Sequence, residues 1–276
     1  MGAVTYTRSP SLVALARQAS YLFIIAGSAV VISDVDVDEL SQILNLTARP
    51  ITREALLDHC AVETIQTLVD LGVLVTSEIT NPPVGPSTSP KRCGRLVVGV
   101  SGAVAATMVL DQIRGLTSTF ADQLDVILTQ NATRFLQPRV FDYHGLQTWT
   151  DPYEPAHGIS VPHKYLAAAD LLLIAPASAN TIHRIASGAC SDLLSLVVAN
   201  TTAPIVVAPS MNAEMWAHPP IARNVAQLRR DGIWVIDPGA GFVLSGEAGI
   251  GAMGFDLPGL LRALDGVLTA TGERRS

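Results

Sequence analysis

Five short, almost entirely apolar runs in the second half of the chain constrain its fold more than any other feature. They are bounded by glycine, proline, aspartate or asparagine and span residues 96–100, 124–129, 171–175, 205–208 and 233–236. Helix-like segments lie between them, at residues 104–113, 163–169, 191–200 and 221–230. Apolar strands joined by helical crossovers are typical of a parallel sheet with helices on both faces. We therefore expect an open, Rossmann-like α/β sheet, with any ligand at the carboxyl ends of its strands.

A proline-rich stretch separates this region from a smaller one before it. Proline sustains neither a helix nor a sheet ladder, so we interpret residues 77–94 as a linker between domains at 1–76 and 95–276. In the first domain, β-rich runs on either side of Gly27 predict a hairpin, and Thr52 is a candidate helix N-cap. The predicted order is strands at 21–25 and 29–33, helices at 37–46, 52–60 and 62–71, and a strand at 73–75. This order resembles a small winged-helix-like α+β domain.

The charge of this first domain argues against DNA. Residues 1–76 carry four Arg, no Lys and eight Asp or Glu, and a surface of that sign repels phosphate. Recognition of a peptide on a strand edge or in a helix groove is the sharper hypothesis. A docking or oligomerisation role is the alternative.

Composition narrows the class of protein further. With 49% hydrophobic and 15% charged residues and a net charge of −6, the chain is not mainly disordered. Despite a mean hydropathy of +0.36, its longest apolar stretch, residues 21–32, is interrupted by Gly27 and falls short of the roughly 20 residues that a membrane span needs. A pI near 5.4 argues against nucleic acid as a partner. Cys60, Cys93 and Cys190 are scattered without a C-x-x-C pattern, which favours reduced thiols in the cytoplasm and no metal site.

Small and polar residues follow three of the predicted strands. Gly99, Ser101, Gly102 and Ala103 lie between the first strand and its helix, where backbone N–H groups bind a phosphate or where strand and helix simply pack closely. After the third strand, Ser178, Asn180 and Thr181 offer donors and acceptors suited to a phosphorylated heteroaromatic cofactor, unless Ser178 or Asn180 is an ordinary helix cap.

After the fourth strand comes the sequence Pro209-Ser210-Met211-Asn212-Ala213-Glu214-Met215-Trp216. The amide of Asn212 is suited to holding a carboxylate. Met211 and Met215 supply soft apolar surface for a flavin ring or a sulfur-containing substrate, unless they fill the core.

These segments resemble the flavin-containing cysteine decarboxylases, which include phosphopantothenoylcysteine decarboxylases and the peptidyl-cysteine decarboxylases of lantibiotic maturation. Residues 176–181 match the family motif P-A-S-A-N-T in full, and residues 209–216 match P-x-M-N-x-x-M-W in full. Supporting matches cover residues 99–106, 128–135 and 188–194, so the resemblance spans roughly residues 95–255.

The resemblance implies FMN as cofactor and trimers, often assembled into dodecamers, with FMN at the subunit interface. It implies that His163 is the base or another active-site histidine, and that Asn212 is a catalytic residue that binds the substrate carboxylate, beside Met215. The implied cofactor-binding residues are Gly99, Ser101, Gly102, Ala103, Thr129, Thr133, Phe135, Ala177, Ser178, Asn180, Thr181, Asp192 and Met211.

Two departures from the family bear on function. Ala103 stands where the phosphate loop commonly has Ser, which removes one hydroxyl contact while the backbone and Ser101 remain. Ser245 stands where the coenzyme A enzymes carry a Cys that protonates and reduces the enethiolate, and a hydroxyl donates a proton less readily than a thiol. We expect Ser245 and Glu247 to bind the substrate, because they belong to a Gly-rich segment that resembles a flap over it.

The sequence therefore predicts oxidative decarboxylation of a peptide's C-terminal cysteine to an aminoenethiol during maturation of a modified peptide. A decarboxylase of coenzyme A biosynthesis is the alternative, and a non-catalytic regulatory relative is the third reading. Synthesis of prenylated flavin is disfavoured because P-x-M-N-x-x-M-W marks the cysteine decarboxylase branch.

Overall fold

The computed structural model describes residues 5–9, 12–25, 28–47, 50–76, 93–237, 240–242, 248–250 and 257–272. Its strands are β1 (Thr5–Arg8), β2 (Val13–Arg17), β3 (Ser20–Ile25), β4 (Ser28–Ser33), β5 (Ile51–Thr52), β6 (Leu74–Thr76), β7 (Cys93–Val100), β8 (Ala121–Leu128), β9 (Gln147–Trp149), β10 (Leu171–Ala177), β11 (Ile205–Pro209), β12 (Trp234–Ile236), β13 (Ala240–Phe242) and β14 (Ala248–Ile250). Its helices are α1 (Val37–Leu46), α2 (Arg53–Leu57), α3 (Val62–Asp70), η1 (Val104–Met108), α4 (Val109–Thr119), η2 (Ala132–Arg134), α5 (Pro138–Asp142), α6 (Pro162–Ala167), α7 (Ala179–Ala186), α8 (Leu193–Asn200), α9 (Ala213–Ala217), α10 (Pro219–Arg230) and α11 (Leu257–Thr271).

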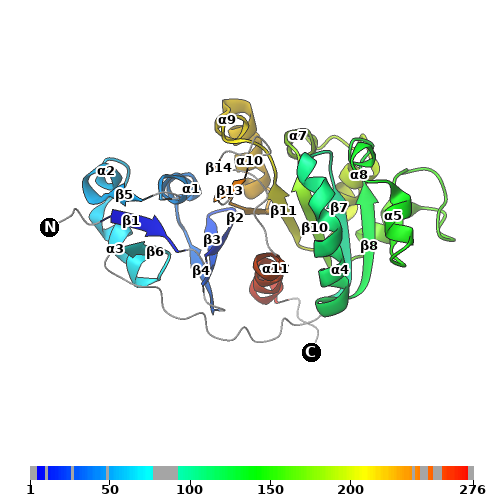
Figure 1. The fold of residues 1–276 in the computed structure, drawn as a ribbon, viewed down its shortest axis with the longest axis horizontal. Helices are drawn as coiled ribbons and strands as arrows, with labels where there is room; N and C mark the ends of the chain where they lie inside the picture. The colour runs from blue at the N-terminus through cyan, green and yellow to red at the C-terminus, as the bar shows by residue number, and fades with distance from the viewer. Residues whose placement is uncertain are drawn as a thin grey trace.

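A nine-stranded sheet forms the centre of the molecule, in the order β4-β3-β2-β12-β11-β10-β7-β8-β9 (Figure 1). The strands from β12 to β9 are parallel. Each of the five predicted apolar runs coincides with one of them, apart from Thr129 and Ile233, which lie just outside β8 and β12. The predicted α/β class with a Rossmann-like sheet is therefore confirmed.

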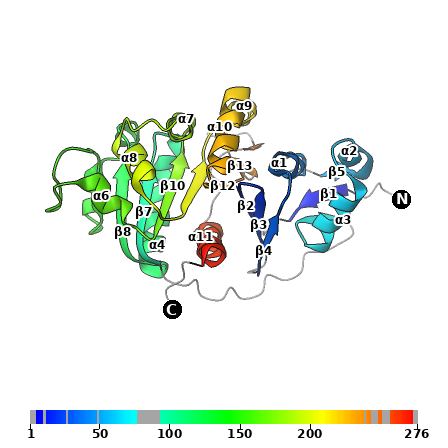
Figure 2. The same ribbon diagram turned by 180° about the vertical axis from the view of Figure 1, so that it is seen from behind.

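Side chains of these strands alternate between two cores, because successive residues of a strand point to opposite faces. Leu96 and Val98 of β7 face one core with helices α4 and α11, whereas Val97 faces the other with α6, α7, α8 and α10. Figures 1 and 2 show the sheet between these two helical layers. Among the described residues, no helix combines the length and the apolar character needed to cross a membrane.

The N-terminal strands extend this sheet, which the sequence analysis did not anticipate. β2 pairs antiparallel with β12, with Val235 opposite Ala16 and Ile236 opposite Leu15. Both faces of β2 and β3 are buried: Leu15 and Leu22 join the core of α4 and α11, while Phe23 joins a third core with α1 and α3. Two covered faces and a partner strand on β12 hold these strands in the central sheet.

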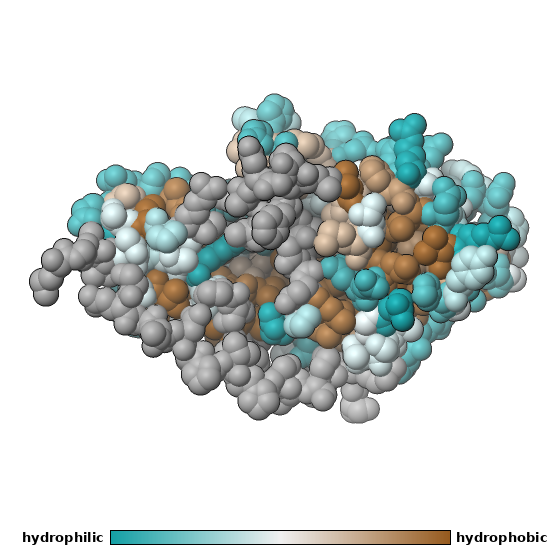
Figure 3. All heavy atoms as spheres, in the orientation of Figure 1, coloured by the Kyte–Doolittle hydropathy of each residue, from teal (hydrophilic) through white to brown (hydrophobic). Residues whose placement is uncertain are grey.

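Helix α11 packs closely across the added strands. A Cβ atom on Gly266 would lie 2.5 Å from Cδ1 of Ile24, so a larger residue would force the Ile24 side chain to move. Apolar residues are visible where β3, β4 and α11 lie in the space-filling view (Figure 3).

The remaining N-terminal elements form a small three-stranded sheet, β5-β1-β6, with helices α1 to α3. The predicted hairpin, three helices and closing strand are present, and Thr52 caps α2 by accepting from the N–H of Ala55. A separate winged-helix-like domain is not confirmed, because β2, β3 and β4 belong to the central sheet. Of the predicted linker, residues 77–92 lie outside the described residues, and β7 already begins at Cys93. The division at 76 and 95 stays a prediction.

Candidate functional site

The site is built from loops at the carboxyl ends of four neighbouring strands. β11, β10, β7 and β8 are consecutive in the sheet and parallel, so their carboxyl ends lie along one edge. Three of them lead directly into helices: β7 into η1 and α4, β10 into α7, and β11 into α9. The starts of these helices offer unpaired N–H groups and a partial positive charge at this edge.

Ser101 joins two of these loops. Its hydroxyl donates to the carbonyl of Pro176 at 2.7 Å and accepts from the N–H of Ser178 at 2.7 Å. The N–H of Ser101 also donates to the Pro176 carbonyl, at 3.1 Å. The side chain is fully buried. Its single proton is thus used within the protein, and Ser101 holds the loop after β7 against the loop after β10.

Gly102 and Gly99 both lie in closely packed places, and the backbone of Asn131 leaves no room for a side chain at Gly102. A Cβ on Gly102 would lie 2.4 Å from Cβ of Asn131, in the loop after β8, and one on Gly99 would lie 2.5 Å from Cδ1 of Leu194. The close packing weighed in the sequence analysis is therefore real at both glycines. Ala103 begins η1 without a side-chain cap.

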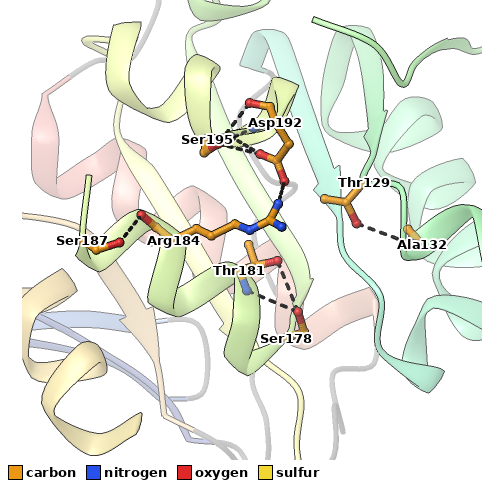
Figure 4. Close-up of polar contacts among 8 residues, drawn as sticks. All are labelled: Thr129, Ala132, Ser178, Thr181, Arg184, Ser187, Asp192 and Ser195. Atoms are coloured by element: carbon orange, nitrogen blue, oxygen red, sulfur yellow. Dashed lines mark hydrogen bonds and ion pairs between the residues drawn. The ribbon is translucent and has the colours of Figure 1, made fainter. Parts of the chain in front are cut away.

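The loop after β8 is held by its own side chains. Oγ1 of Thr129 accepts from the N–H of Ala132 at 3.3 Å (Figure 4). The hydroxyl of Thr133 donates to the Gln130 carbonyl at 2.8 Å. Phe135 follows with 41% of its surface exposed, so an aromatic ring remains uncovered beside this loop.

Helix α7 begins with the predicted cap. Ser178 accepts from the N–H of Thr181 at 3.4 Å, and the two hydroxyls are 3.2 Å apart (Figure 4). Ala177 is fully buried, whereas Asn180, on the first turn, is exposed. The side chain of Asn180 is therefore accessible at the carboxyl edge of the sheet.

Asp192 serves the fold through two interactions. It caps α8 by accepting from the N–H of Ser195 at 2.8 Å, in a capping box, and it binds Nη1 of Arg184 at 2.6 Å (Figure 4). The ion pair ties α8 to α7. No sequence motif pointed to Arg184, because the pair forms only when the two helices pack.

Asn212 caps α9 with its amide oxygen, which accepts from the N–H of Met215 at 2.9 Å. The cap leaves the amide NH2 group of this exposed residue as the donor, and an NH2 group suits a carboxylate ligand. Met211 is buried beside it, and Met215 is 42% exposed. The N–H of Ser210 donates to the Ala177 carbonyl at 2.9 Å and so joins the two motif loops.

His163 lies apart from this hydrogen-bonded cluster, on the first turn of α6, which packs against α8. Its Nδ1 atom is buried and has no hydrogen-bond partner among the described residues. A buried imidazole nitrogen without a hydrogen-bond partner is unusual. Ser245 and Glu247, the expected substrate-binding residues, lie outside the described residues.

A buried cluster under α6 was missed by the sequence analysis. Arg95 binds Asp125 with N–O distances of 3.0 and 2.9 Å, and Trp149 donates to the same carboxylate at 2.9 Å. Arg95 also donates to the carbonyl of Tyr165 at 2.7 Å and lies over its ring. These contacts hold α6, and with it His163, against the sheet.

Comparison with known proteins gives a consistent result. Residues 85–255 match the model of the family described as Flavoprotein. Among curated proteins, the chain is 37% identical over 161 residues to the coenzyme A biosynthesis bifunctional protein CoaBC of Mycobacterium tuberculosis, covering 58% of this chain and 38% of that protein. The chain thus spans about two fifths of the length of the curated relatives it matches.

Two solved structures have a similar fold and sequence. A cysteine-to-serine mutant of PPC decarboxylase in complex with pantothenoylaminoethenethiol is 31% identical, with a TM-score of 0.57, covering 65% of this chain and 100% of that one. The FMN-dependent cysteine decarboxylase SpaF is 30% identical, with a TM-score of 0.51, covering 62% of this chain and 97% of that one.

Proposed function

The chain belongs to the Flavoprotein family, and from this premise we propose that it catalyses FMN-dependent oxidative decarboxylation of a peptide's C-terminal cysteine. The product would be an aminoenethiol, and the reaction would belong to the maturation of a modified peptide. In this proposal residues 1–76 bind the leader segment of the precursor, and the active form is a homotrimer or a dodecamer of such trimers.

The carboxyl edge of the sheet fits FMN. The helix starts after β7, β10 and β11 favour a phosphate and a carboxylate through their N–H groups and dipoles. Gly102 and Ala103 would lie at the phosphate, and Ser178, Asn180 and Met211 at the flavin ring. Oxidised flavin supplies a two-electron acceptor at this edge.

The side chains of this protein would bind the substrate and move its proton. The Asn212 NH2 group would hold the substrate carboxylate, since its oxygen is occupied by the cap of α9. His163 would take the thiol proton or the Cβ proton of the substrate cysteine. Met215 would cover the sulfur with apolar surface.

One observation carries the proposal. The two motif loops, 176–181 and 209–216, lie on adjacent strands and are joined by the hydrogen bond from Ser210 to Ala177. This bond brings the cap of α7 and the amide of Asn212 to neighbouring positions on one edge. A cofactor group and a carboxylate are then within reach of the same site.

Ser245 supports the oxidised product over the reduced one, because a hydroxyl is the poorer proton donor for an enethiolate. The mutant PPC decarboxylase, in which a cysteine is replaced by serine, holds an aminoethenethiol. The second candidate, a decarboxylase acting on phosphopantothenoylcysteine, is favoured by the identity to CoaBC.

Mass spectrometry separates the two candidates. FMN-loaded protein is mixed in air with a peptide ending in Cys or with phosphopantothenoylcysteine. We expect the peptide to lose CO2 and two hydrogens. The variant Asn212→Asp keeps an oxygen for the cap of α9 but replaces the NH2 group by a charge that repels the carboxylate, so it should bind flavin and turn over at least about tenfold more slowly.

Two outcomes would contradict the proposal. Loss of CO2 alone from phosphopantothenoylcysteine, with the peptide unchanged, would assign the coenzyme A reaction. Protein that neither retains FMN nor alters either substrate would assign a non-catalytic relative.

A further inference from the structure

Strand β4 forms the outer edge of the nine-stranded sheet. It pairs with β3 through six consecutive residue pairs, from Ser33 opposite Ser20 to Ser28 opposite Ile25, without a shift in register. Natural edge strands are usually protected by Lys, Pro or a bulge. β4 has the sequence SAVVIS and carries none of these, and no strand of the described residues pairs with its outer side.

The side chains of this edge also favour a partner strand. Val30 is 37% exposed and Val31 is 48% exposed. As neighbours on a strand they point to opposite faces of the sheet. A strand added beside β4 would cover part of both side chains and would satisfy the outward backbone groups.

The charge next to β4 indicates the chemistry of the partner. Asp34, Asp36 and Asp38 follow the strand directly and are exposed. Two of the four arginines of this region are engaged: Arg8 is mostly buried near Asp237, and Arg17 lies over the ring of Trp234. An acidic surface of this kind attracts a cationic peptide.

The chain's own residues 77–92 are a poor occupant, because they contain four prolines that lack the N–H group of a ladder. We propose that the edge of β4 binds an extended, Lys- or Arg-containing segment of the precursor peptide by strand addition. This inference rests on the proposed function, whose substrate it describes in more detail.

The strand order adds a rule for the spacing within that peptide. β4 and β10 belong to one sheet and are five strand-to-strand steps apart. A strand docked outside β4 adds a sixth step, so at about 4.8 Å a step it lies about 29 Å from β10. An extended chain advances about 3.3 Å per residue, so at least about nine residues must separate the docked segment from the C-terminal cysteine.

The test uses fluorescein-labelled peptides with a segment of alternating Val and Lys, a Gly-Ser spacer and a C-terminal Cys. Spacers of about 3, 9 and 15 residues bracket the expected span. Val31→Lys places a charge on the edge, and Val62→Lys is the matched control, because Val62 is 46% exposed on α3. Melting temperatures of both variants report that they fold.

We expect Val31→Lys to weaken binding at least about tenfold and Val62→Lys to change it less than about twofold. Binding should weaken with added salt. At low peptide concentration, the two longer spacers should be decarboxylated faster than the shortest. Equal binding to wild type and Val31→Lys, or equal rates for all spacers, would overturn the inference.

Two further outcomes separate this inference from its premise. A four-residue peptide ending in Cys that is decarboxylated at high concentration, while Val31→Lys has no effect on binding, would leave the function standing and remove the docking edge. If Val31→Lys loses binding and no peptide is decarboxylated, peptide binding at the β4 edge is supported and the proposed decarboxylation is contradicted. If sedimentation shows that Val31→Lys only dissociates copies of the chain, the edge is an interface between copies and the inference is wrong.

Discussion

At the scale of single residues, Ser101 in the motif that resembles a phosphate loop holds the loop after β7 against the loop after β10. Ser101 was expected to contact the cofactor, yet its hydroxyl proton is donated to Pro176 and its oxygen accepts from Ser178. A serine that has already donated its proton cannot donate it to a phosphate. Its contribution to flavin binding is then to fix the loop after β7 in position beside the loop after β10.

Replacement of Ser101 by Ala tests this role. The N–H of Ser178 loses its acceptor, which costs about 1–3 kcal/mol for a buried group. We expect the affinities for FMN and for riboflavin to fall together, by about tenfold, as followed by quenching of flavin fluorescence. Ser118→Ala, which removes an exposed hydroxyl from α4, is the control. If only the FMN affinity fell, Ser101 would be a phosphate ligand.

At the scale of elements, α6 carries His163 and is fixed through a buried ion pair. The Asp125 side chain is 1% exposed and that of Arg95 is 14% exposed, and Arg95 binds the last turn of α6 through the Tyr165 carbonyl. Removing one member of a buried ion pair lowers the stability of the fold, because the remaining charge is buried without a partner. The position of His163 thus depends on a pair formed beneath its helix.

Asp125→Asn should lower the free energy of unfolding by about 3–5 kcal/mol, because Arg95 remains buried without its carboxylate. The control is Asp111→Asn, which removes an exposed Arg–Asp pair at 3.8 Å on α4. That change should cost less than about 0.5 kcal/mol. Urea denaturation of both variants measures the difference, and equal midpoints would contradict the structural role given to Asp125.

At the scale of the whole molecule, a buried polar cluster fastens the N-terminal region to the sheet. Asp237, which follows β12, accepts from the Tyr21 hydroxyl at 2.6 Å and from Nη2 of Arg229 at 2.7 Å, and Arg229 donates to Ser41 of α1 at 2.8 Å. Burial by itself would lower the pKa of Arg229, but the charge of Asp237, the effect of Tyr21 and the hydrogen bond to Asp237 together raise it. The N-terminal region and the central sheet should therefore unfold in one transition.

Tyr21→Phe tests this junction through its pH dependence. Burial, followed by the charge of Asp237, raises the pKa of Tyr21 well above 10.0. The stabilisation linked to this shift is present below pH 10.0 and is lost as the pH rises through the folded-state pKa. The variant should lose about 1–3 kcal/mol at neutral pH.

The difference in unfolding free energy between wild type and Tyr21→Phe should narrow above pH 10.0. Urea titrations across that range measure it. Tyr143→Phe is the control, because Tyr143 is 79% exposed and should cause no such difference. Two separate unfolding transitions in the wild type would contradict the joint core.

Much of the molecule follows from local patterns in the sequence. The parallel strands appear as apolar runs between turn residues, and the caps of α2 and α7 rest on Thr52 and Ser178, within three residues of their partners. Periodicity and capping act over a few residues, so they determined where strands and helices begin. The same motifs placed the candidate site at the carboxyl edge.

Contacts between distant residues were decided only by the tertiary structure. Ser101 meets Ser178 across 77 positions, Tyr21 meets Asp237 across 216, and β2 joins β12 although the sequence assigns them to different domains. Such pairings depend on which faces are buried against each other, and no local pattern records that. The sequence by itself determined the α/β class and the motif loops. Packing determined that Ser101 joins two loops and that the N-terminal strands continue the sheet.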